Sequence, residues 1–555
     1  MSRTTSGRRL AGLTAVVSAA ALLAACGSGG DGGGSGSPEG SGSGSDAAAG
    51  DPVEGGELLY LEYQPYTTLY PPQSGFYPNG ALIANITDRL VYQDPETLEF
   101  SPWIATDWTV NTDATEYTFN LRGGVTFSDG SPLDAEVVAK NFDTYGLGDA
   151  EAGFPVSEQI NNYVSSEVVD ADTVTFRFSA PSPGFLQATS ANGAGLLSSA
   201  TLDGDLDAYA PGNGTGVVGS GPFVIAEETV GTEILLEARD DYDWAPAESE
   251  HQGRAYLDGV RFSVTPEDSV RIGALTSGQT DVIRYVQAYD EAQVEQAGLQ
   301  LFAPQTQGVN NSLSLRFTND ILSDINVRKA IVAGVNAQEV VDTVFTPNYP
   351  VATGVLSHTA LGYVDHEAEL AYDPDEANRL LDEAGWTLGS DGIREKDGQK
   401  LTLVASEAKP QPLSRDTLTL VAQQLKAIGV DLQILAADSG TYAEAIKDPD
   451  QVQLYHSMVG RTDLDVIKSQ YASTNRNANL SNDAELDRLL GLVASTADPA
   501  ARLQASADAQ QYLVDQAYVI PLFEEPQVYG AQDYVKGFGW DTVARPVFYN
   551  TWLAK

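Results

Sequence analysis

Several stretches of the chain alternate between apolar and polar residues, which predicts β-strands with one buried face. At residues 117–121, Tyr, Phe and Leu alternate with Thr and Asn. Residues 164–170 and 173–178 are separated by a short polar turn and are predicted to form a hairpin. Val125 and Phe127 follow a pair of glycines and predict one more short strand. The pattern therefore predicts a strand-rich region in the first half of the chain.

Capping residues mark the starts of several helices. Asp134 stands before an apolar stretch, where its carboxylate can accept a free backbone N–H. Asn336 followed by Glu339 forms a capping box, in which each side chain reaches the backbone of the other residue. Asp373 repeats this arrangement with a proline in the first turn, and Gly385 is predicted to end that helix in the left-handed conformation.

Strands and helices alternate in the second half of the chain. Residues 401–406, 414–428 and 430–435 predict strand, helix and strand. A connection of that length favours parallel strands joined by a right-handed crossover. Residues 269–278 and 281–283 predict a further helix and strand. The fold class is therefore predicted to be α/β.

The chain begins with a segment that is typical of secretion. A start with three arginines precedes an uncharged, largely apolar run at residues 10–25. The run ends in Leu-Ala-Ala-Cys, which resembles a lipobox, and Cys26 is the only cysteine of 555 residues. We interpret residues 1–25 as a lipoprotein signal peptide and Cys26 as the site of lipid attachment. The alternative is a signal peptide that ends near a cysteine by chance.

Residues 26–54 are predicted to form a linker behind the lipid. Residues 27–50 consist almost entirely of Gly, Ser, Ala and Asp, so they cannot build a core. Such a chain has a root-mean-square reach of roughly 25–30 Å. Because no later stretch reaches the ~20 apolar residues that span a bilayer, we expect the protein to be held at a membrane by its lipid anchor only.

The chain is strongly acidic, with 31 basic and 77 acidic residues and a net charge of −46. Loss of the leader with its three arginines changes the balance to 28 basic against 77 acidic residues. Such a surface repels nucleic acid and anionic lipid headgroups, so we expect no nucleic-acid partner. Solubility in an exposed environment is the simplest reason for the charge.

Motifs for catalysis or for a cofactor are missing from the sequence. There is no G-x-S-x-G elbow and no Walker A motif. Residues 214–219 match G-x-G-x-x-G, but a strand and not a helix is predicted to follow, which excludes a dinucleotide site. With one cysteine and four scattered histidines, no built-in metal site and no cofactor are expected. The sequence gives no indication of an enzyme. The histidines are His251, His358, His366 and His456.

One long stretch resembles a known family. Residues 104–138 read IATDWTVNTDATEYTFNLRGGVTFSDGSPLDAEVV. This sequence resembles the motif of bacterial extracellular solute-binding proteins of family 5, the peptide, nickel and opine type. Later segments also resemble motifs of the family, among them residues 324–345 and 372–386. The resemblance implies a substrate-binding protein that delivers a small solute to an ABC importer.

The same resemblance implies two lobes of a large type II periplasmic-binding-protein fold, with a strand-rich subdomain inserted in lobe one. Crossings between the lobes would then form a hinge that closes on the solute. The predicted boundaries are residues 55–80, 218–309 and 517–555 for lobe one, 81–217 for the inserted subdomain, and 310–516 for lobe two.

Four residues are predicted to contact the solute. Tyr63 and Tyr66 follow the first strand, where the family has a loop that faces the cleft, although simple packing of the rings is an equal alternative. Residues 452–463 correspond to the segment in which peptide-binding members hold the α-ammonium group with an acid, and Asp463 matches that acid. Arg461 replaces the family's tryptophan, and it can pair with Asp463 or receive a solute carboxylate. A surface ion pair between Arg461 and Asp463 is the alternative.

Two functions stay open at this point. The first is a tethered receptor that captures a small solute, peptide-like by family default, and passes it to ABC permease subunits. The second is a binding-protein scaffold used for signalling, adhesion or chaperoning without transport. In either function we expect a monomer that is lipid-anchored on the extracytoplasmic face of the cell membrane.

Overall fold

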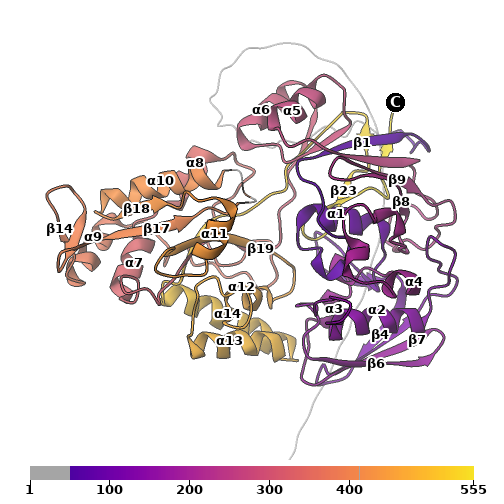
Figure 1. The fold of residues 1–555 in the computed structure, drawn as a ribbon, viewed down its shortest axis with the longest axis horizontal. Coiled ribbons are helices and arrows are strands. Elements are labelled where there is room, and N and C mark those ends of the chain that lie inside the picture. The colour runs from indigo at the N-terminus through magenta and orange to yellow at the C-terminus, as the bar shows by residue number, and fades with distance from the viewer. Residues whose placement is uncertain (1–49, 410, 412) are drawn as a thin grey trace, which may run out of the picture. The chain divides into compact units, whose positions relative to one another are not determined.

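Two β-sheets organise residues 50–409, 411 and 413–555, which are the residues that the computed structural model describes (Figure 1). The predicted signal peptide, Cys26 and nearly all of the linker lie outside the described residues, so those predictions stay predictions. We call the part built on the first sheet lobe one and the part built on the second sheet lobe two. Figure 1 shows the indigo and magenta elements around the first sheet and the orange elements around the second.

Sheet one contains segments from three separated parts of the chain. Its first strand pairs in parallel with strands on both sides, and the outer pairings are antiparallel. Two helices connect its strands, α5 (Asp268–Thr276) and α6 (Ala288–Gln296). In order across the sheet the described strands are β12 (Gln300–Phe302), β21 (Tyr529–Ala531), β11 (Val282–Arg284), β1 (Glu57–Glu62), β10 (Gly259–Val264), β9 (Glu233–Ala238) and β8 (Phe223–Thr229).

The strand-rich region lies between β1 and β8 and forms its own sheet. The apolar residues of the alternating stretch at 117–121 are buried, as predicted, and the side chain of Asp134 accepts a hydrogen bond from Val137 N at 3.0 Å. This part of the chain contains β2 (Val91–Gln93), β3 (Phe100–Pro102), β4 (Ala105–Val110), β5 (Glu116–Leu121), β6 (Tyr163–Asp170), β7 (Thr173–Phe178), α1 (Tyr77–Ile86), α2 (Ala135–Leu147), α3 (Phe185–Ala188) and α4 (Ser199–Leu202).

The short strand predicted at Val125 and Phe127 is wrong. The chain there folds back on its own turn, with Phe127 N donating to Ser131 O at 2.9 Å. Only an isolated bridge between Thr126 and Pro132 results. Residues 214–216 form a short 3-10 helix, and β8 follows at Phe223, in agreement with the strand predicted after that glycine motif.

Sheet two contains the strands of the second half of the chain, where strands and helices alternate. The parallel pairing predicted across the crossover at residues 401–435 is confirmed. Its described strands run in the order β18 (Asp431–Ile434), β17 (Thr402–Ser406), β19 (Leu454–Gly460), β13 (Gly308–Leu315) and β20 (Val519–Phe523). The helices around it are α7 (Ile325–Ala333), α8 (Ala337–Val344), α9 (Pro374–Glu383), α10 (Ser414–Ala427), α11 (Ser439–Ala445), α12 (Val466–Tyr471), α13 (Ala484–Ser495) and α14 (Pro499–Asp515).

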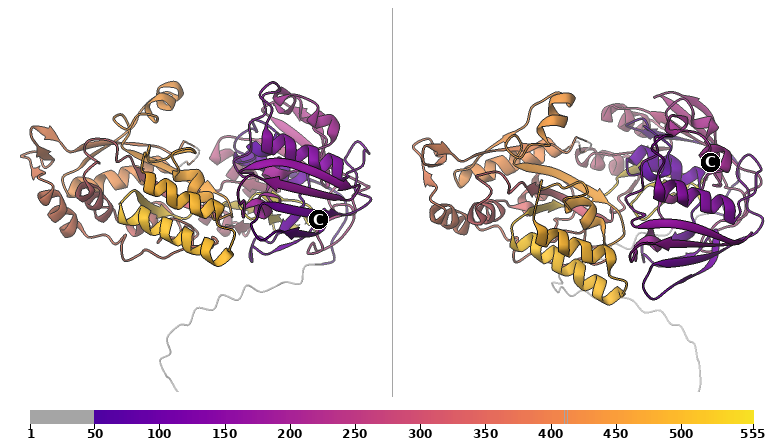
Figure 2. Two further views of the ribbon diagram at one scale, coloured as in Figure 1. Left: turned by 90° about the horizontal axis from the view of Figure 1, so that it is seen from below. Right: turned by 60° about the horizontal axis from the view of Figure 1, so that its bottom comes forward.

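Both predicted N-caps of this lobe are present, but neither capping box closes, because Asn336 N donates to Gln424 Oε1 at 3.1 Å and Asp373 N donates to Ala333 O at 2.9 Å. Asn336 Oδ1 accepts from Glu339 N at 3.0 Å, and Asp373 Oδ1 accepts from Glu376 N at 2.9 Å. Gly385 has the expected positive φ, +84°. The last two helices, α13 and α14, pack along one another and are the yellow-orange pair in Figure 2. The remaining short strands are β14 (Thr387–Leu388), β15 (Arg394–Lys396), β16 (Gln399–Lys400), β22 (Val535–Lys536), β23 (Gly539–Trp540), β24 (Pro546–Val547) and β25 (Trp552–Leu553).

The chain passes between the sheets at two places that matter for the site. It leaves β12 of sheet one and enters β13 of sheet two between residues 302 and 308. It returns between β20 and β21, at residues 523–529. Residues 517–523 were expected to belong to lobe one, but β20 pairs with β13 in sheet two. The strand is buried along its whole length, so it completes the core of lobe two before the chain returns.

Candidate functional site

A cavity of about 520 Å³ lies between the two lobes, and we call it the first cavity. Lobe one contributes residues that follow β1 and β11, and lobe two contributes β19, α11 and neighbouring loops. Both crossings also reach it. The tyrosine, histidine and charged side chains that line it are Tyr63, Tyr77, Arg284, Tyr285, Lys409, Tyr442, Tyr455, His456, Arg476, Glu525 and Arg545. A volume of this size suits a small organic solute.

The wall of lobe one is built around Arg284 at the end of β11. Its Nη1 donates to Glu62 Oε1 at 2.8 Å, and both side chains are buried. The guanidinium lies 3.3 Å from the ring centroid of Tyr77, a cation–π contact. Tyr63 and Tyr285 stack beside it, with centroids 4.8 Å apart and planes 11° from parallel. These contacts hold the wall in one conformation, and preorganisation lowers the cost of binding.

The wall of lobe two includes the consecutive β19 residues Tyr455 and His456. The His456 ring is buried, and its Nδ1 lies 2.8 Å from Ser414 Oγ. Burial lowers the pKa of His456 to about 4, so the ring is neutral at physiological pH. A neutral imidazole contributes hydrogen bonds and no charge to the cavity.

Glu525 lies on the second crossing and brings a carboxyl group to the cavity. The side chain is buried, and Asn311 Nδ2 donates to its Oε2 at 2.6 Å. Burial raises the pKa of Glu525 to about 7, although the Asn311 hydrogen bond and the charge of Arg284 oppose the shift. The carboxyl group therefore exchanges its proton near neutral pH.

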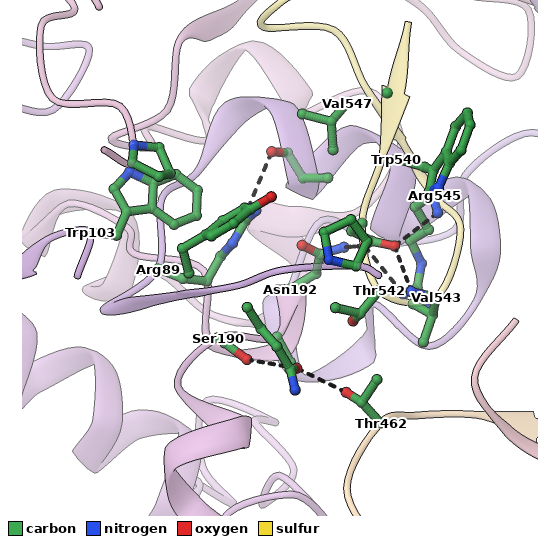
Figure 3. Close-up of a pocket in the computed structure, with 18 of the residues that line it drawn as sticks. Arg89, Trp103, Ser190, Asn192, Thr462, Trp540, Thr542, Val543, Arg545 and Val547 are labelled. Atoms are coloured by element: carbon green, nitrogen blue, oxygen red, sulfur yellow. Dashed lines mark hydrogen bonds and ion pairs between the residues drawn. The ribbon is translucent and has the colours of Figure 1, made fainter. Parts of the chain in front are cut away.

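A second cavity of about 310 Å³ adjoins the first, since Gly75, Gly460, Val543 and Arg545 line both. In Figure 3 Arg89 lies beside the ring of Trp103, with 4.5 Å between the guanidinium carbon and the ring centroid.

A polar cluster closes another side of the second cavity. Gln93 Oε1 accepts from Ser190 Oγ at 3.4 Å and from Thr462 Oγ1 at 3.1 Å (Figure 3). Gln187 Nε2 donates to Thr462 Oγ1 at 2.8 Å. These hydrogen bonds join the inserted subdomain to the loop that follows β19.

The two predicted tyrosines lie in different places. Tyr63 lines the first cavity, and its ring also packs on Tyr285. The predicted position at the cleft and the alternative of simple ring packing therefore both describe part of its environment. Tyr66 does not line either cavity. Its hydroxyl donates to Glu228 Oε1 at 2.5 Å, beside a pocket of only about 30 Å³.

Asp463 and Arg461 are both buried, but they do not pair with each other. Arg502 Nη1 donates to Asp463 Oδ2 at 2.9 Å, and Arg461 forms its ion pair with Asp465. Both the suggested pairing of Arg461 with Asp463 and the alternative of a surface ion pair between them are therefore wrong, because Arg502 of α14, distant in the sequence, pairs with Asp463. Arg461 lines the second cavity, whereas Asp463 lies outside the lining of both.

The electrostatics of Asp463 follow from this pair. Burial alone would raise the pKa of its carboxyl, but the Arg502 guanidinium outweighs burial and holds the pKa well below the usual value. Burial and the neighbouring Asp463 charge raise the pKa of Asp465. A Cβ on Gly184 would lie 2.9 Å from Asp463 Oδ1, so the inserted subdomain approaches this carboxylate closely. Asp463 is thus occupied by protein groups.

None of the charged residues that line the first cavity was predicted from the sequence. Arg284 is the last residue of β11 and Glu525 lies just after β20, so a charge at the end of an apolar strand was the available signal. Lys409 and Arg476 lie in loops with no such signal. Among residues 50–409, 411 and 413–555, no three His, Cys, Asp or Glu side chains lie together as a metal site would require. The same part of the chain contains no helix that could cross a membrane.

Comparison with known proteins places these features in a family. A family model described as bacterial extracellular solute-binding proteins, family 5, matches residues 99–478. The dipeptide-binding protein of Escherichia coli K12 is 25% identical in an alignment of 489 positions, which covers 83% of this chain and 88% of that protein. The nickel-binding periplasmic protein of the same organism is 24% identical in an alignment of 467 positions, which covers 76% of this chain and 80% of that protein.

Solved structures agree with the two-lobed fold. The structure of NikA from Brucella suis in complex with Fe(III)-EDTA has a TM-score of 0.75 at 22% identity, covering 90% of this chain and 100% of that chain. That of the oligopeptide-binding protein AppA from Bacillus subtilis, in complex with a nonapeptide, has a TM-score of 0.74 at 21% identity. It covers 91% of this chain and 100% of that chain. The predicted fold class, a large periplasmic-binding-protein-like fold, is confirmed.

Proposed function

Because the chain belongs to the bacterial extracellular solute-binding proteins of family 5, we propose that it captures a small solute in the first cavity and delivers it to an ABC importer. The observation that carries this proposal is a cavity of about 520 Å³ walled by both lobes. A solute that touches both walls stabilises the closed arrangement of the lobes over an open one. Binding then requires no chemical change of the solute.

The arrangement of the crossings supports capture by closure. Residues 302–308 and 523–529 connect the two sheets, and Thr306, Glu525 and Gln527 on these segments line the first cavity. Hinges are a few element-terminal residues that absorb large changes in φ and ψ. Segments that both connect the lobes and touch the solute couple occupancy to closure directly.

The relatives suggest a range of solutes. Their names describe binding of dipeptides, glutathione and nickel. We propose a solute of comparable size for this chain. Tyr63 is proposed to contact it, and Arg461 could contact a solute that extends into the second cavity. Tyr66 and Asp463 are not proposed as contacts, since protein groups occupy both.

Attachment to the membrane belongs to the same proposal. We propose that the protein acts as a monomer on the extracytoplasmic face, held by acyl chains on Cys26 and by no other membrane contact. Two or more acyl chains anchor a protein stably, whereas one binds only marginally. Replacing Cys26 with Ser should move the protein from the membrane fraction to the medium. Retention of the Cys26→Ser protein in washed membranes would contradict the lipid anchor.

Thermal unfolding with a solute library tests capture. A solute present at 100 times its Kd should stabilise the protein by about 2.7 kcal/mol, which raises Tm measurably. Small-angle scattering should then show compaction with the same solute, because the lobes close on it. A library of peptides, metal chelates, opines and sugars in which nothing raises Tm would contradict solute capture and favour a scaffold without transport.

A further inference from the structure

The first cavity differs in charge from the rest of the molecule. The chain has 31 basic and 77 acidic residues, so acidic side chains dominate its surface. Among the described residues that line the cavity, the basic ones are Arg284, Lys409, Arg476 and Arg545, and the acidic one is Glu525. The excess of acidic over basic residues in the chain is therefore reversed in the lining of the first cavity.

Two of these cations are matched by carboxylates of the protein. Arg284 is paired with buried Glu62. Arg545 lies 3.8 Å from an Asp541 carboxylate oxygen, a looser pair. These two guanidinium groups shape the wall but add little net charge to it.

The other two cations are not matched. Among the residues that the structure describes, neither Lys409 nor Arg476 forms an ion pair with an acidic side chain. Lys409 Nζ lies 5.0 Å from the ring centroid of Tyr442. Arg476 Nη1 donates only to neutral oxygens, those of Met458 O at 3.2 Å and Gln470 Oε1 at 3.4 Å. Both side chains belong to lobe two and are exposed, so they can reorient toward a solute without breaking a buried contact.

An ammonium group would find no comparable partner. Glu525 is already hydrogen-bonded to Asn311, and it lies beside the positive charge of Arg284. Asp463, the acid expected to receive an ammonium group, is paired with Arg502 outside the cavity lining. A buried ammonium without a carboxylate partner is strongly unfavourable.

We propose that the first cavity selects an anionic solute, whose carboxylate or similar group is bound by Lys409 and Arg476, over cationic and neutral analogues. This proposal rests on the proposed function, since it requires that the cavity captures a solute. Arg476 can bind a carboxylate through two parallel N–H donors, and Lys409 adds a point charge. The tyrosines on both walls provide flat apolar surface for the body of the solute. They are Tyr63, Tyr77, Tyr285, Tyr442 and Tyr455.

The test uses probes that differ only in charge. The panel of probes starts from three kinds of acid, namely aliphatic dicarboxylates, N-acyl amino acids and aromatic acids. Each acid is compared with its amide and with the corresponding amine. Thermal unfolding of the full chain selects the stabilising probes, and calorimetric titration gives their Kd. We expect the acids to bind, the amides to bind at least about tenfold more weakly, and the amines not to bind.

Variants locate the effect. Arg476→Gln and Lys409→Gln should each weaken the best acid by about tenfold and reduce the dependence of its Kd on salt. Arg488→Gln, an exposed arginine of α13 away from the cavity, should change neither. Because all three residues are exposed, the variants are expected to fold.

The outcomes separate the two proposals. Amines or amides that bind as tightly as the acids would overturn anion selection and leave solute capture intact. Acid binding that is unchanged in both Arg476→Gln and Lys409→Gln would also overturn it. A panel in which no probe of any charge stabilises the protein would overturn capture in this cavity and the selection that rests on it.

Discussion

The loop after β19 and the wall of the first cavity use charged side chains in opposite ways. In the loop, each buried charge has a protein partner, Asp463 with Arg502 and Asp465 with Arg461. At the cavity, Arg284 is paired in the same way, but Lys409 and Arg476 have no acidic partner among the described residues. The loop is therefore saturated, whereas the cavity retains charge for a solute.

This difference follows from solvation. Desolvating a charge costs several kcal/mol unless an opposite charge and hydrogen bonds compensate it, so fully buried charges are found paired. A cation beside a water-filled cavity stays solvated until a solute replaces the water. Buried pairs thus report on how the lobes are built, and unpaired cations at a cavity report on what it binds.

The largest predicted effect concerns the saturated loop. Replacing Arg502 with Met leaves Asp463 buried without its cation, which should cost about 3–5 kcal/mol of unfolding free energy. Denaturant unfolding measures this loss. Arg488→Met, which removes an exposed pair, is the matched control and should leave the unfolding midpoint nearly unchanged.

A second substitution checks the reason for that loss. Adding Asp463→Asn to Arg502→Met removes the unpaired charge and should recover most of the stability.

The ion pair of Asp463 and Arg502 also makes the stability of the protein depend on pH. The pKa of Asp463 is lower in the folded state, so its stabilisation is present above the unfolded pKa of about 3.9 and is lost as the pH falls toward the folded value. An Arg502→Met protein as stable as the parent would contradict the saturated loop.

Glu525 should show the opposite dependence on pH. Its pKa is raised from 4.5 to about 7 in the folded protein, so the stability that it contributes is present below pH 4.5 and is lost as the pH rises through 7. The loss is at most about 3 kcal/mol. Glu525→Gln stays neutral at all pH values, so its stability relative to the parent should rise over this interval. Parallel pH profiles for the two proteins would show that Glu525 titrates normally.

The two tyrosines give the smallest and most selective effect. Tyr63→Ala removes a ring from the cavity wall and should weaken the best solute by about 1–2 kcal/mol. Tyr66→Phe removes the hydroxyl that donates to Glu228 and should cost about 1 kcal/mol of stability while leaving affinity unchanged. Calorimetric titration and thermal unfolding separate these effects. Equal losses of affinity in both variants would remove the distinction between them.

The sequence predicts the elements of this fold better than its site, for physical reasons. Alternation at residues 117–121 and the caps Asp134, Asn336 and Asp373 depend on local chemistry, and the structure confirms them. The family resemblance predicts the two lobes and the type of protein. Partners of buried charges depend on residues distant in the chain.

Particular residues illustrate this limit. Arg502 reaches Asp463 across 39 positions, and Arg284 reaches Glu62 across 222. No local pattern marks either pair. The role of β20 was also misread from the sequence, because an apolar strand alone does not reveal which sheet it joins.

The most direct test of the account is a crystal structure of the protein with the acid that stabilises it most. The account predicts that the solute lies in the first cavity, with its body between Tyr63 and Tyr455 and its carboxylate within hydrogen-bond distance of Arg476 or Lys409. A solute found outside this cavity, or one held through an ammonium group by Asp463, would contradict it.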